Sequence, residues 1–315
     1  MEYYILIAAM AVAFSIGAND LANAIGTTVG SNVLTYRAAV LYGGVAVAVG
    51  ALLGGGSTVE TVGKGIIDTT MVDATLLTMA ILCAALTVAV ATYLSFPVSA
   101  TQSLVGALAG TGIAMGLSLN NSVLLSIAVV WTLLPLISMG LSFSLYFMLK
   151  AIFSIIYARW YTTYEGLIRF LVIASGIFVA FSLGTNNIGN VVGILDVNSV
   201  IDHDVAVLLG AICITMGAFV FSKRVILSIG KRITTMDPLR AFVSQVATAL
   251  SVLICTCVGI PVSISQATVG SVIGCGLTKG RASVNRRFIA KIIVSWVLSP
   301  LLSGAMMYAV QGIIG

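Results

Sequence analysis

The sequence contains two related halves, and this duplication strongly limits the folds open to it. The stretch "FSIGANDLANAIG", from Phe14, recurs 167 positions later as "FSLGTNNIGNVVG", from Phe181. The stretch "FPVSATQSLVGALAG", from Phe96, recurs 164 positions later as "IPVSISQATVGSVIG", from Ile260. Each half therefore carries one copy of each motif in the same order, and the two halves are expected to share a fold.

Both motifs lie in long apolar stretches, which indicates a membrane protein. Hydrophobic residues make up 59% of the chain, charged residues only 8%, and the mean hydropathy is +1.14, far from the composition of a soluble domain. A window of about 20 residues, the length of a membrane-spanning helix, identifies ten apolar segments. We therefore expect an all-α polytopic membrane protein with segments near 3–30, 38–55, 71–95, 97–117, 122–150, 165–190, 203–222, 240–258, 260–278 and 288–313.

The number of segments predicts how the two halves are related. Five segments per half is an odd number, so the second half must enter the membrane from the opposite side, which gives an inverted-topology repeat. We expect a first repeat over 1–150, a cytoplasmic linker over 151–164 and a second repeat over 165–315. Segments 71–95 and 97–117 are joined by almost no loop and could form a re-entrant hairpin instead of two crossings. With such a hairpin in each half, the number of membrane crossings per half would still be odd. Many secondary transporters alternate access through this architecture.

The basic residues predict the orientation. If all ten segments cross, only Lys64 falls on one side of the membrane, and the other fourteen Lys and Arg residues fall on the opposite side. The positive-inside rule places these fourteen in the cytoplasm and both termini outside. Topology therefore explains the basic loops, and no nucleic-acid partner is expected. The fourteen are Arg37, Lys150, Arg159, Arg169, Lys223, Arg224, Lys231, Arg232, Arg240, Lys279, Arg281, Arg286, Arg287 and Lys291.

The first duplicated motif predicts a cation site. Glycines and short polar side chains weaken a helix, so we expect both copies to interrupt their spans. Carboxylate, amide and backbone oxygens there would form an oxygen-only ligand set, which suits a small cation such as sodium. The alternative is a polar contact between helices without a ligand. The candidate sodium ligands are Asn19, Asp20 and Asn23 in the first copy and Asn186, Asn187 and Asn190 in the second.

The second duplicated motif predicts an anion site. Pro97 and Pro261 can each start a helix, whose free N–H groups and positive dipole end attract an anion. Two such helix starts that face each other would enclose a tetrahedral oxyanion. Neither motif contains Lys or Arg, so co-bound cations must neutralise the anion, which is a physical reason for coupling to sodium. The candidate anion ligands are Ser99, Thr101, Gln102, Ser103, Ser263, Ser265 and Gln266, together with Asp20, which would accept a hydrogen bond from a protonated oxyanion.

At these motifs the sequence resembles the inorganic phosphate transporter (PiT) family. The stretch "GANDLANAIGTTVGS" is similar to the first signature of that family, "GTNNIGN" to the second, and "VETVGKGIID", from Val59, to the segment after the second span. The resemblance implies a sodium- or proton-coupled phosphate symporter that alternates access, forms a homodimer and is a compact prokaryotic form in the plasma (inner) membrane. It adds Glu60 to the sodium ligands. The equivalent second-repeat position is Leu227, which leaves the coupling ion open.

Other functions stay open at this point. Sulfate is also a tetrahedral oxyanion, although only a protonated phosphate can donate a hydrogen bond to Asp20. An anion channel would need no coupling ion. An intramembrane enzyme is disfavoured because no Ser/His, Cys/His or paired Asp arrangement is present. We therefore expect a sodium-coupled phosphate importer without a cofactor. A proton-coupled phosphate or sulfate permease is the alternative.

Overall fold

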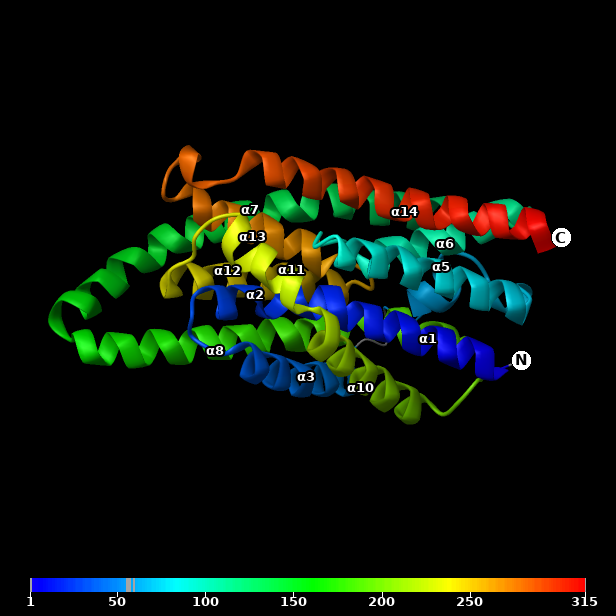
Figure 1. Ribbon diagram of the computed structural model, residues 1–315, viewed down its shortest axis with the longest axis horizontal. Helices are drawn as coiled ribbons and strands as arrows, with labels where there is room; N and C mark the ends of the chain where they lie inside the picture. Colours follow the sequence, from blue (N-terminus) through cyan, green and yellow to red (C-terminus); the bar gives the residue numbers. More distant parts are fainter. Residues whose placement is uncertain (1, 55–57, 59, 315) are drawn as a thin grey trace.

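The computed structural model describes residues 2–54, 58 and 60–314. In Figure 1 the helices run along the long axis of an elongated bundle, and both termini lie at one end. The described residues contain eight helical segments that are long and apolar enough to cross a membrane. They comprise α1 (Glu2–Ile16) with η1 (Gly17–Leu21) and α2 (Ala22–Gly30), α3 (Tyr36–Leu53), α5 (Ala74–Tyr93), α7 (Asn121–Arg159), α8 (Tyr161–Asn187) with α9 (Gly189–Val197), α10 (His203–Phe221), α12 (Pro238–Cys257) and α14 (Arg286–Ile314).

Each of the ten predicted apolar segments contains a helix, and Gly55, the last residue of one of them, lies outside the described residues. Two of these helices are short: α6 (Ala100–Met115) has 16 residues and α13 (Ile264–Leu277) has 14. At about 1.5 Å per residue they measure roughly 24 and 21 Å, less than the roughly 30 Å of a hydrocarbon core. Helix α6 packs against α5, and α13 packs against α12, so each short helix is the second arm of a helical hairpin.

The tips of both hairpins lie at the depth of the Asn motifs. Asn19, in the middle of the span Tyr3–Gly30, accepts a hydrogen bond from the backbone N–H of Val98 (3.1 Å) and donates one to the carbonyl oxygen of Phe96 (3.0 Å). Asn186 accepts one from the N–H of Val262 (3.3 Å). In each hairpin the chain therefore turns back inside the bundle, beside an Asn motif. Figure 1 places α5 and α6 toward the end with the termini, and α12 and α13 toward the opposite end.

The helices remain nearly continuous through the Asn motifs. In the first copy Gly17–Leu21 forms a π-helical turn between α1 and α2, and the flanking residues keep right-handed helical dihedral angles. In the second copy Ile188 alone separates α8 from α9, again with helical angles. The predicted interruption is thus a widened turn in one copy and a one-residue junction in the other.

Glycines let each short hairpin helix pack closely on a long helix. A Cβ atom on Gly106 of α6 would lie 2.2 Å from the carbonyl oxygen of Pro300 on α14. A Cβ atom on Gly270 of α13 would lie 2.2 Å from the carbonyl oxygen of Pro135 on α7. Only glycine fits at such contacts. The two Gly-x-x-x-Gly stretches therefore serve helix packing, as expected for this pattern.

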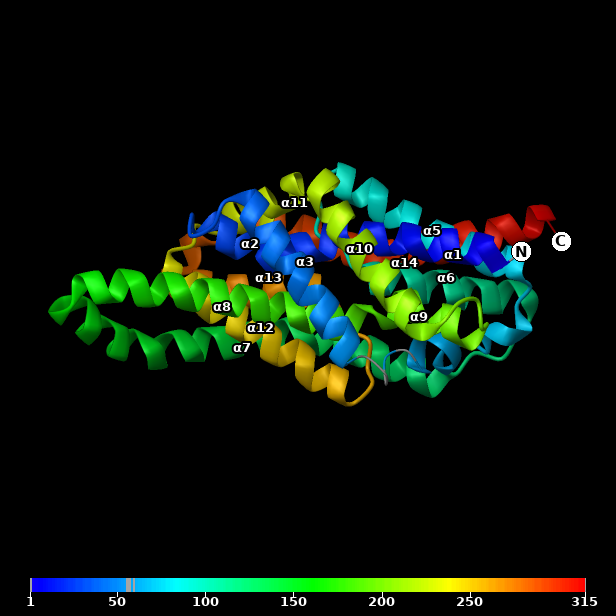
Figure 2. The same cartoon turned by 90° about the horizontal axis from the view of Figure 1, so that it is seen from below.

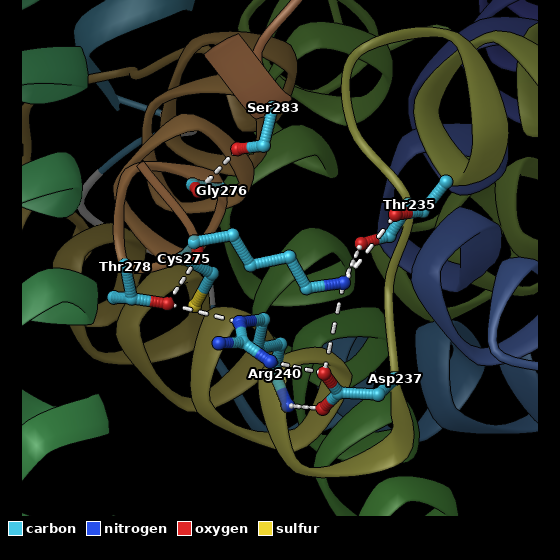
Figure 3. Close-up of polar contacts among 8 residues, drawn as sticks. Thr235, Asp237, Arg240, Cys275, Gly276, Thr278 and Ser283 are labelled. Carbon is cyan, nitrogen blue, oxygen red and sulfur yellow. Dashed lines mark hydrogen bonds and ion pairs between the residues drawn. The ribbon is translucent and has the colours of Figure 1, made fainter. Parts of the chain in front are cut away.

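The base of the α12–α13 hairpin is held by charged side chains (Figure 3). Asp237 caps α12 by accepting a hydrogen bond from the N–H of Arg240 (3.0 Å), and the two side chains also form an ion pair. The Arg240 side chain donates to Thr278 Oγ1 beyond the end of α13 (2.9 Å). Lys279 Nζ lies 3.8 Å from Asp237 Oδ2. These contacts join the first residue of one arm to the last residues of the other.

Helices α7 and α8 form a long hairpin that extends beyond the other helices, at the end away from the termini (Figure 2). The segment 151–164, expected as the linker between the halves, is helical on both sides of Trp160.

Candidate substrate and ion site

The two Asn motifs meet in the centre of the bundle. Asn187 Nδ2 donates a hydrogen bond to Asp20 Oδ2 at 3.0 Å, although 167 positions separate them in the sequence. Asp20 is 1% exposed, and Asn187 is fully buried. The duplicated motifs predict that these two residues, which occupy equivalent positions in the two copies, lie close together, and the hydrogen bond between them confirms it.

A hydroxyl from each hairpin tip extends this contact. Ser265 Oγ accepts a hydrogen bond from Asn23 Nδ2 and lies within donating distance of Asp20 Oδ1 (3.2 Å) and of the Val98 carbonyl. Thr101 Oγ1 is 3.4 Å from Asn187 Oδ1 and accepts a hydrogen bond from Asn190 Nδ2 at 2.8 Å. The six side chains therefore form one continuous chain of hydrogen bonds, which we call the Asp20 chain. Its order is Asn190, Thr101, Asn187, Asp20, Ser265 and Asn23.

Successive members of the Asp20 chain come from opposite halves of the sequence. Every hydrogen bond in it therefore joins the first half to the second. Its order is also symmetric, because Asn23 is equivalent to Asn190, Ser265 to Thr101, and Asp20 to Asn187. The site is incomplete without both halves.

Asn19 and Asn186 have a different environment. Asn19 Nδ2 donates to Thr92 Oγ1, and Asn186 Nδ2 donates to Thr256 Oγ1, both at 2.9 Å. The same two asparagines accept the backbone hydrogen bonds from the hairpin tips described above. Each one thus ties its motif to the hairpin of its own half. This is a polar contact between helices, the expected alternative to a ligand site. Their role as sodium ligands stays a prediction.

The hairpin tips are helix N-termini, but the helices begin after the prolines. Ser99 is the N-cap of α6, and its hydroxyl accepts a hydrogen bond from the N–H of Gln102 (3.1 Å). Ser263 caps α13 in the same way through Gln266 (3.2 Å). Ser103 Oγ donates to the Ser99 carbonyl (3.1 Å). The helices' own backbone therefore uses all three of these serine hydroxyls, because serine is a strong N-cap.

At the two duplicated motifs, four buried amide oxygens have no hydrogen-bond partner among the described residues. They form two equivalent pairs, one in the Asn motifs and one at the hairpin tips. Such oxygens are costly to bury unless a cation, a water molecule or a donating ligand meets them. Rotation of the amide would instead present its NH₂ group to an anion. The atoms are Asn23 Oδ1, Asn190 Oδ1, Gln102 Oε1 and Gln266 Oε1.

The two glutamines line a shared cavity of about 740 Å³ between α7, α13 and α14. Trp131 and Trp296 also line it. The Trp131 indole N–H donates to the Pro261 carbonyl (3.2 Å), while Trp296 donates to the Pro97 carbonyl (3.1 Å). Each tryptophan therefore holds the hairpin tip of the other half. No role was expected for these two residues, although the repeated stretches "WTLLP" and "WVLSP" mark them in the sequence.

Glu60 is not a member of the Asp20 chain, and its role as a sodium ligand stays a prediction. Its side chain is exposed, and no hydrogen bond or ion pair connects it to the Asp20 chain within the described part of the molecule. Val59, where the resemblance to the third family segment begins, lies outside the described residues.

Known proteins resemble this chain in sequence and in fold. The sequence model of the phosphate transporter family matches residues 16–307. A putative phosphate permease of Methanocaldococcus jannaschii is 30% identical over 95% of this chain and 93% of its own length. A sulfate permease of Bacillus subtilis is 29% identical over 98% of this chain and 86% of its own length.

A solved structure described as "the sodium-dependent phosphate transporter" superposes with a TM-score of 0.88 at 26% identity, covering 99% of this chain and 98% of the other. The resemblance noted from the motifs is confirmed. The match over nearly the whole sequence shows that the chain belongs to the phosphate transporter family, as a multi-span membrane transporter and not an enzyme.

Proposed function

We propose that the protein imports inorganic phosphate together with sodium ions by alternating access. The Asp20 chain carries this proposal, because both halves supply alternate members of one buried polar site. A relative motion of the two halves would separate these members and expose the site. The names of similar proteins, which mention phosphate and sodium, also support the proposal.

An inverted repeat would provide the alternating motion. The two hairpins point inward from opposite ends of the bundle in Figure 1, and equivalent residues make equivalent bonds in the two halves. Residues 1–150 would form one repeat and residues 165–315 the other, joined by 151–164. The uneven distribution of Lys and Arg supports an orientation with both termini outside, and the plasma membrane as its location is part of the proposal. Assembly as a homodimer is part of the same proposal.

Sodium would bind at the Asp20 chain. A buried carboxylate is costly in a membrane unless a cation accompanies it, by about 2.5–3.5 kcal/mol even on the lenient insertion scale. The unpartnered Oδ1 atoms of Asn23 and Asn190 offer neutral oxygen ligands beside Asp20. Phosphate would bind at the hairpin tips, where the Gln102 and Gln266 amides and the Thr101 and Ser265 hydroxyls supply neutral donors.

Transport by the purified protein tests this proposal. Radiolabelled phosphate uptake into proteoliposomes should require an inward sodium gradient, and it should continue when a proton gradient is abolished. Uptake driven by protons alone would contradict sodium coupling. Uptake without saturation would indicate a channel.

Sulfate is the second candidate substrate, because one relative at 29% identity is named a sulfate permease. Both anions are tetrahedral and accept hydrogen bonds from amides and hydroxyls. They differ in that phosphate is protonated near neutral pH and can donate to Asp20, whereas sulfate cannot. Excess sulfate should therefore compete weakly with phosphate uptake. Efficient competition would instead assign sulfate as the substrate.

A further inference from the structure

The buried walls on the two sides of the Asp20 chain differ in polarity. Eight positions around α2, α12 and α13 carry hydroxyl or amide side chains, while their repeat equivalents around α9, α5 and α6 are all apolar. All sixteen side chains are at most 5% exposed. The polar set is Thr27, Thr28, Ser175, Ser244, Gln245, Thr248, Thr268 and Ser271. The equivalent apolar set is Ile194, Leu195, Ala8, Ala80, Ile81, Ala84, Leu104 and Ala107.

Several of the polar side chains link neighbouring helices. Gln245 of α12 donates to Thr28 of α2 and accepts from Ser175 of α8 at 2.6 Å. Thr248 of α12 and Ser271 of α13 share a hydrogen bond of 2.6 Å. These bonds continue the polar interior beyond the site, in the direction of the Lys- and Arg-rich loops.

Two hydroxyls adjoin the Asp20 chain directly. Thr27 follows Asn23 by four residues on α2, and Thr268 follows Ser265 by three residues on α13, so each lies one helical turn further along the same face. Neither Thr27 Oγ1 nor Thr268 Oγ1 has a hydrogen-bond partner within the described residues. A buried hydroxyl without a partner is unfavourable, which points to water or an ion at this place during part of the cycle.

The opposite wall lacks such groups. The buried hydroxyls of Thr78 and Thr87 in α5 and of Thr111 in α6 each donate to the carbonyl four residues earlier in their own helix. At the positions equivalent to Thr27 and Thr268 the wall carries Ile194 and Leu104. Apolar constrictions block ions because water leaves them.

We infer that phosphate and its coupling ion leave the Asp20 chain through a polar passage between α2 and the α12–α13 hairpin, past Thr27 and Thr268, toward the Lys- and Arg-rich end. The equivalent place on the other side, at Ile194 and Leu104, acts as a hydrophobic gate that excludes water and ions when it is closed. This inference rests on the proposed transport function and adds the route of release. In the present structure the passage is closed, since all of its residues are buried.

Thiol accessibility tests the route. In a variant whose five native cysteines are replaced by serine or alanine, Thr27→Cys and Thr268→Cys are compared with Ile194→Cys and Leu104→Cys. A membrane-impermeant, hydrophilic thiol reagent is applied to vesicles of either orientation. The two threonine positions should react from the Lys- and Arg-rich side at least about tenfold faster than the other two react from either side, a ratio that corresponds to about 1.4 kcal/mol. Equal reactivity of the four positions, or no reaction at Thr27 and Thr268, would overturn the inference.

Exchange of the wall residues gives a second readout. The double variant Thr27→Ile with Thr268→Leu places the apolar residues of the opposite wall in the passage. It should slow uptake by at least about tenfold, while phosphate binding to the detergent-solubilised protein is retained. Uptake at the parent rate would contradict the inference. The thiol measurement needs no assumption about the substrate. If the parent protein fails to take up phosphate but labelling remains one-sided, the proposed function fails and the polar passage remains.

Discussion

The two helical hairpins have nearly identical tips and different bases. At the tips, Ser99 and Ser263 cap their helices in the same way, and the tryptophans Trp131 and Trp296 each bond to the carbonyl of the opposite tip. At the base of α12–α13, Arg240 pairs with Asp237 and reaches Thr278. In α5–α6 the helix cap remains as Asp73, but the position of Arg240 is occupied by Leu76 and that of Lys279 by Met115.

This difference distinguishes the tip residues, which the site requires in both halves, from the base residues, which differ between the halves. The tips are alike because the Asp20 chain takes alternate members from both of them. The bases contact different surroundings and are free to differ. Within the described residues no hydrogen bond joins a side chain of α5 to one of α6, whereas Thr248 and Ser271 link α12 to α13. We therefore expect the α12–α13 hairpin to move as a more tightly connected unit.

One difference lies inside the site itself. The first copy has Asp20 where the second has Asn187, and the two side chains are bonded to each other. The pseudo-symmetric site thus holds a single carboxylate, and only one half supplies its charge.

The largest effect is expected from Asp20→Asn, which makes the two copies alike at this position. The change keeps the shape of the side chain but removes the charge that would balance a cation. Hydrogen bonds and contacts to charged groups contribute about 1.5–3 kcal/mol, so sodium-driven phosphate uptake should fall by at least about tenfold. The variant should fold, because Asn187 shows that an amide fits here. Uptake in proteoliposomes with the sodium dependence of the parent would refute the role of Asp20.

Matched variants sharpen this test. Asp68→Asn and Asp73→Asn change exposed carboxylates that cap local turns, and asparagine caps nearly as well, so uptake should be close to that of the parent. The double variant Asp20→Asn with Asn187→Asp moves the carboxylate to the other copy. Because the two positions are in contact, part of the sodium-driven uptake should return.

Much of this site could be predicted from the sequence. The duplicated motifs and the odd number of segments predicted that Asp20 and Asn187 would meet, because a repeated motif in two packed halves tends to converge on one site. The amides of the motifs could not be told apart, however. Asn19 and Asn23 have the same chemistry, and only the position of the hairpin tip decides that Asn19 holds backbone groups while Asn23 joins the Asp20 chain.

The helix geometry was harder to predict. Glycine and asparagine weaken a helix in water, so an interruption was expected at Gly17. Close packing kept the chain helical there, because a Cβ atom on Gly17 would lie 1.7 Å from the carbonyl oxygen of Ile214 on α10. The glycine thus serves a contact between helices rather than a break. The partner of such a contact is distant in the sequence and leaves no local signal.

The next effect in size tests whether the tips are functionally equivalent. Gln102→Ala and Gln266→Ala each remove one amide from the cavity that both residues line. Loss of a neutral hydrogen bond of about 1 kcal/mol should raise the phosphate concentration for half-maximal uptake several-fold, by a similar factor in both variants. Gln311→Ala, near the end of α14, is the control. An unchanged apparent phosphate affinity in both variants would remove the tips from the substrate site.

A smaller effect is expected when the support of each tip is weakened. Trp131→Phe and Trp296→Phe keep the aromatic ring but remove the N–H that bonds to the opposite tip carbonyl. Each change should lower the maximal uptake rate a few-fold, through about 1 kcal/mol of lost hydrogen bonding, with less effect on apparent affinity. A loss confined to one of the two variants would show that the tips differ more than their contacts suggest.

The smallest effect concerns the bases, where the two hairpins differ most. Arg240→Leu copies the residue of the first hairpin, Leu76, and removes the ion pair with Asp237, the bond to Thr278 and the stacking of the guanidinium on Tyr146, whose ring centre is 4.3 Å away. A partly exposed ion pair contributes about 1 kcal/mol or less, so the thermal midpoint in detergent should fall by only about 2–4 °C.

The reverse exchange, Leu76→Arg, is the informative control. It places a guanidinium three residues after Asp73, as Arg240 follows Asp237, but without the residues that surround Arg240. Since Leu76 is 8% exposed, the buried charge should destabilise the protein instead of forming a second stabilising ion pair at the base of the first hairpin. Were Leu76→Arg to raise the thermal midpoint, or Arg240→Leu to leave it unchanged, the base of the α12–α13 hairpin would not be the more tightly connected of the two.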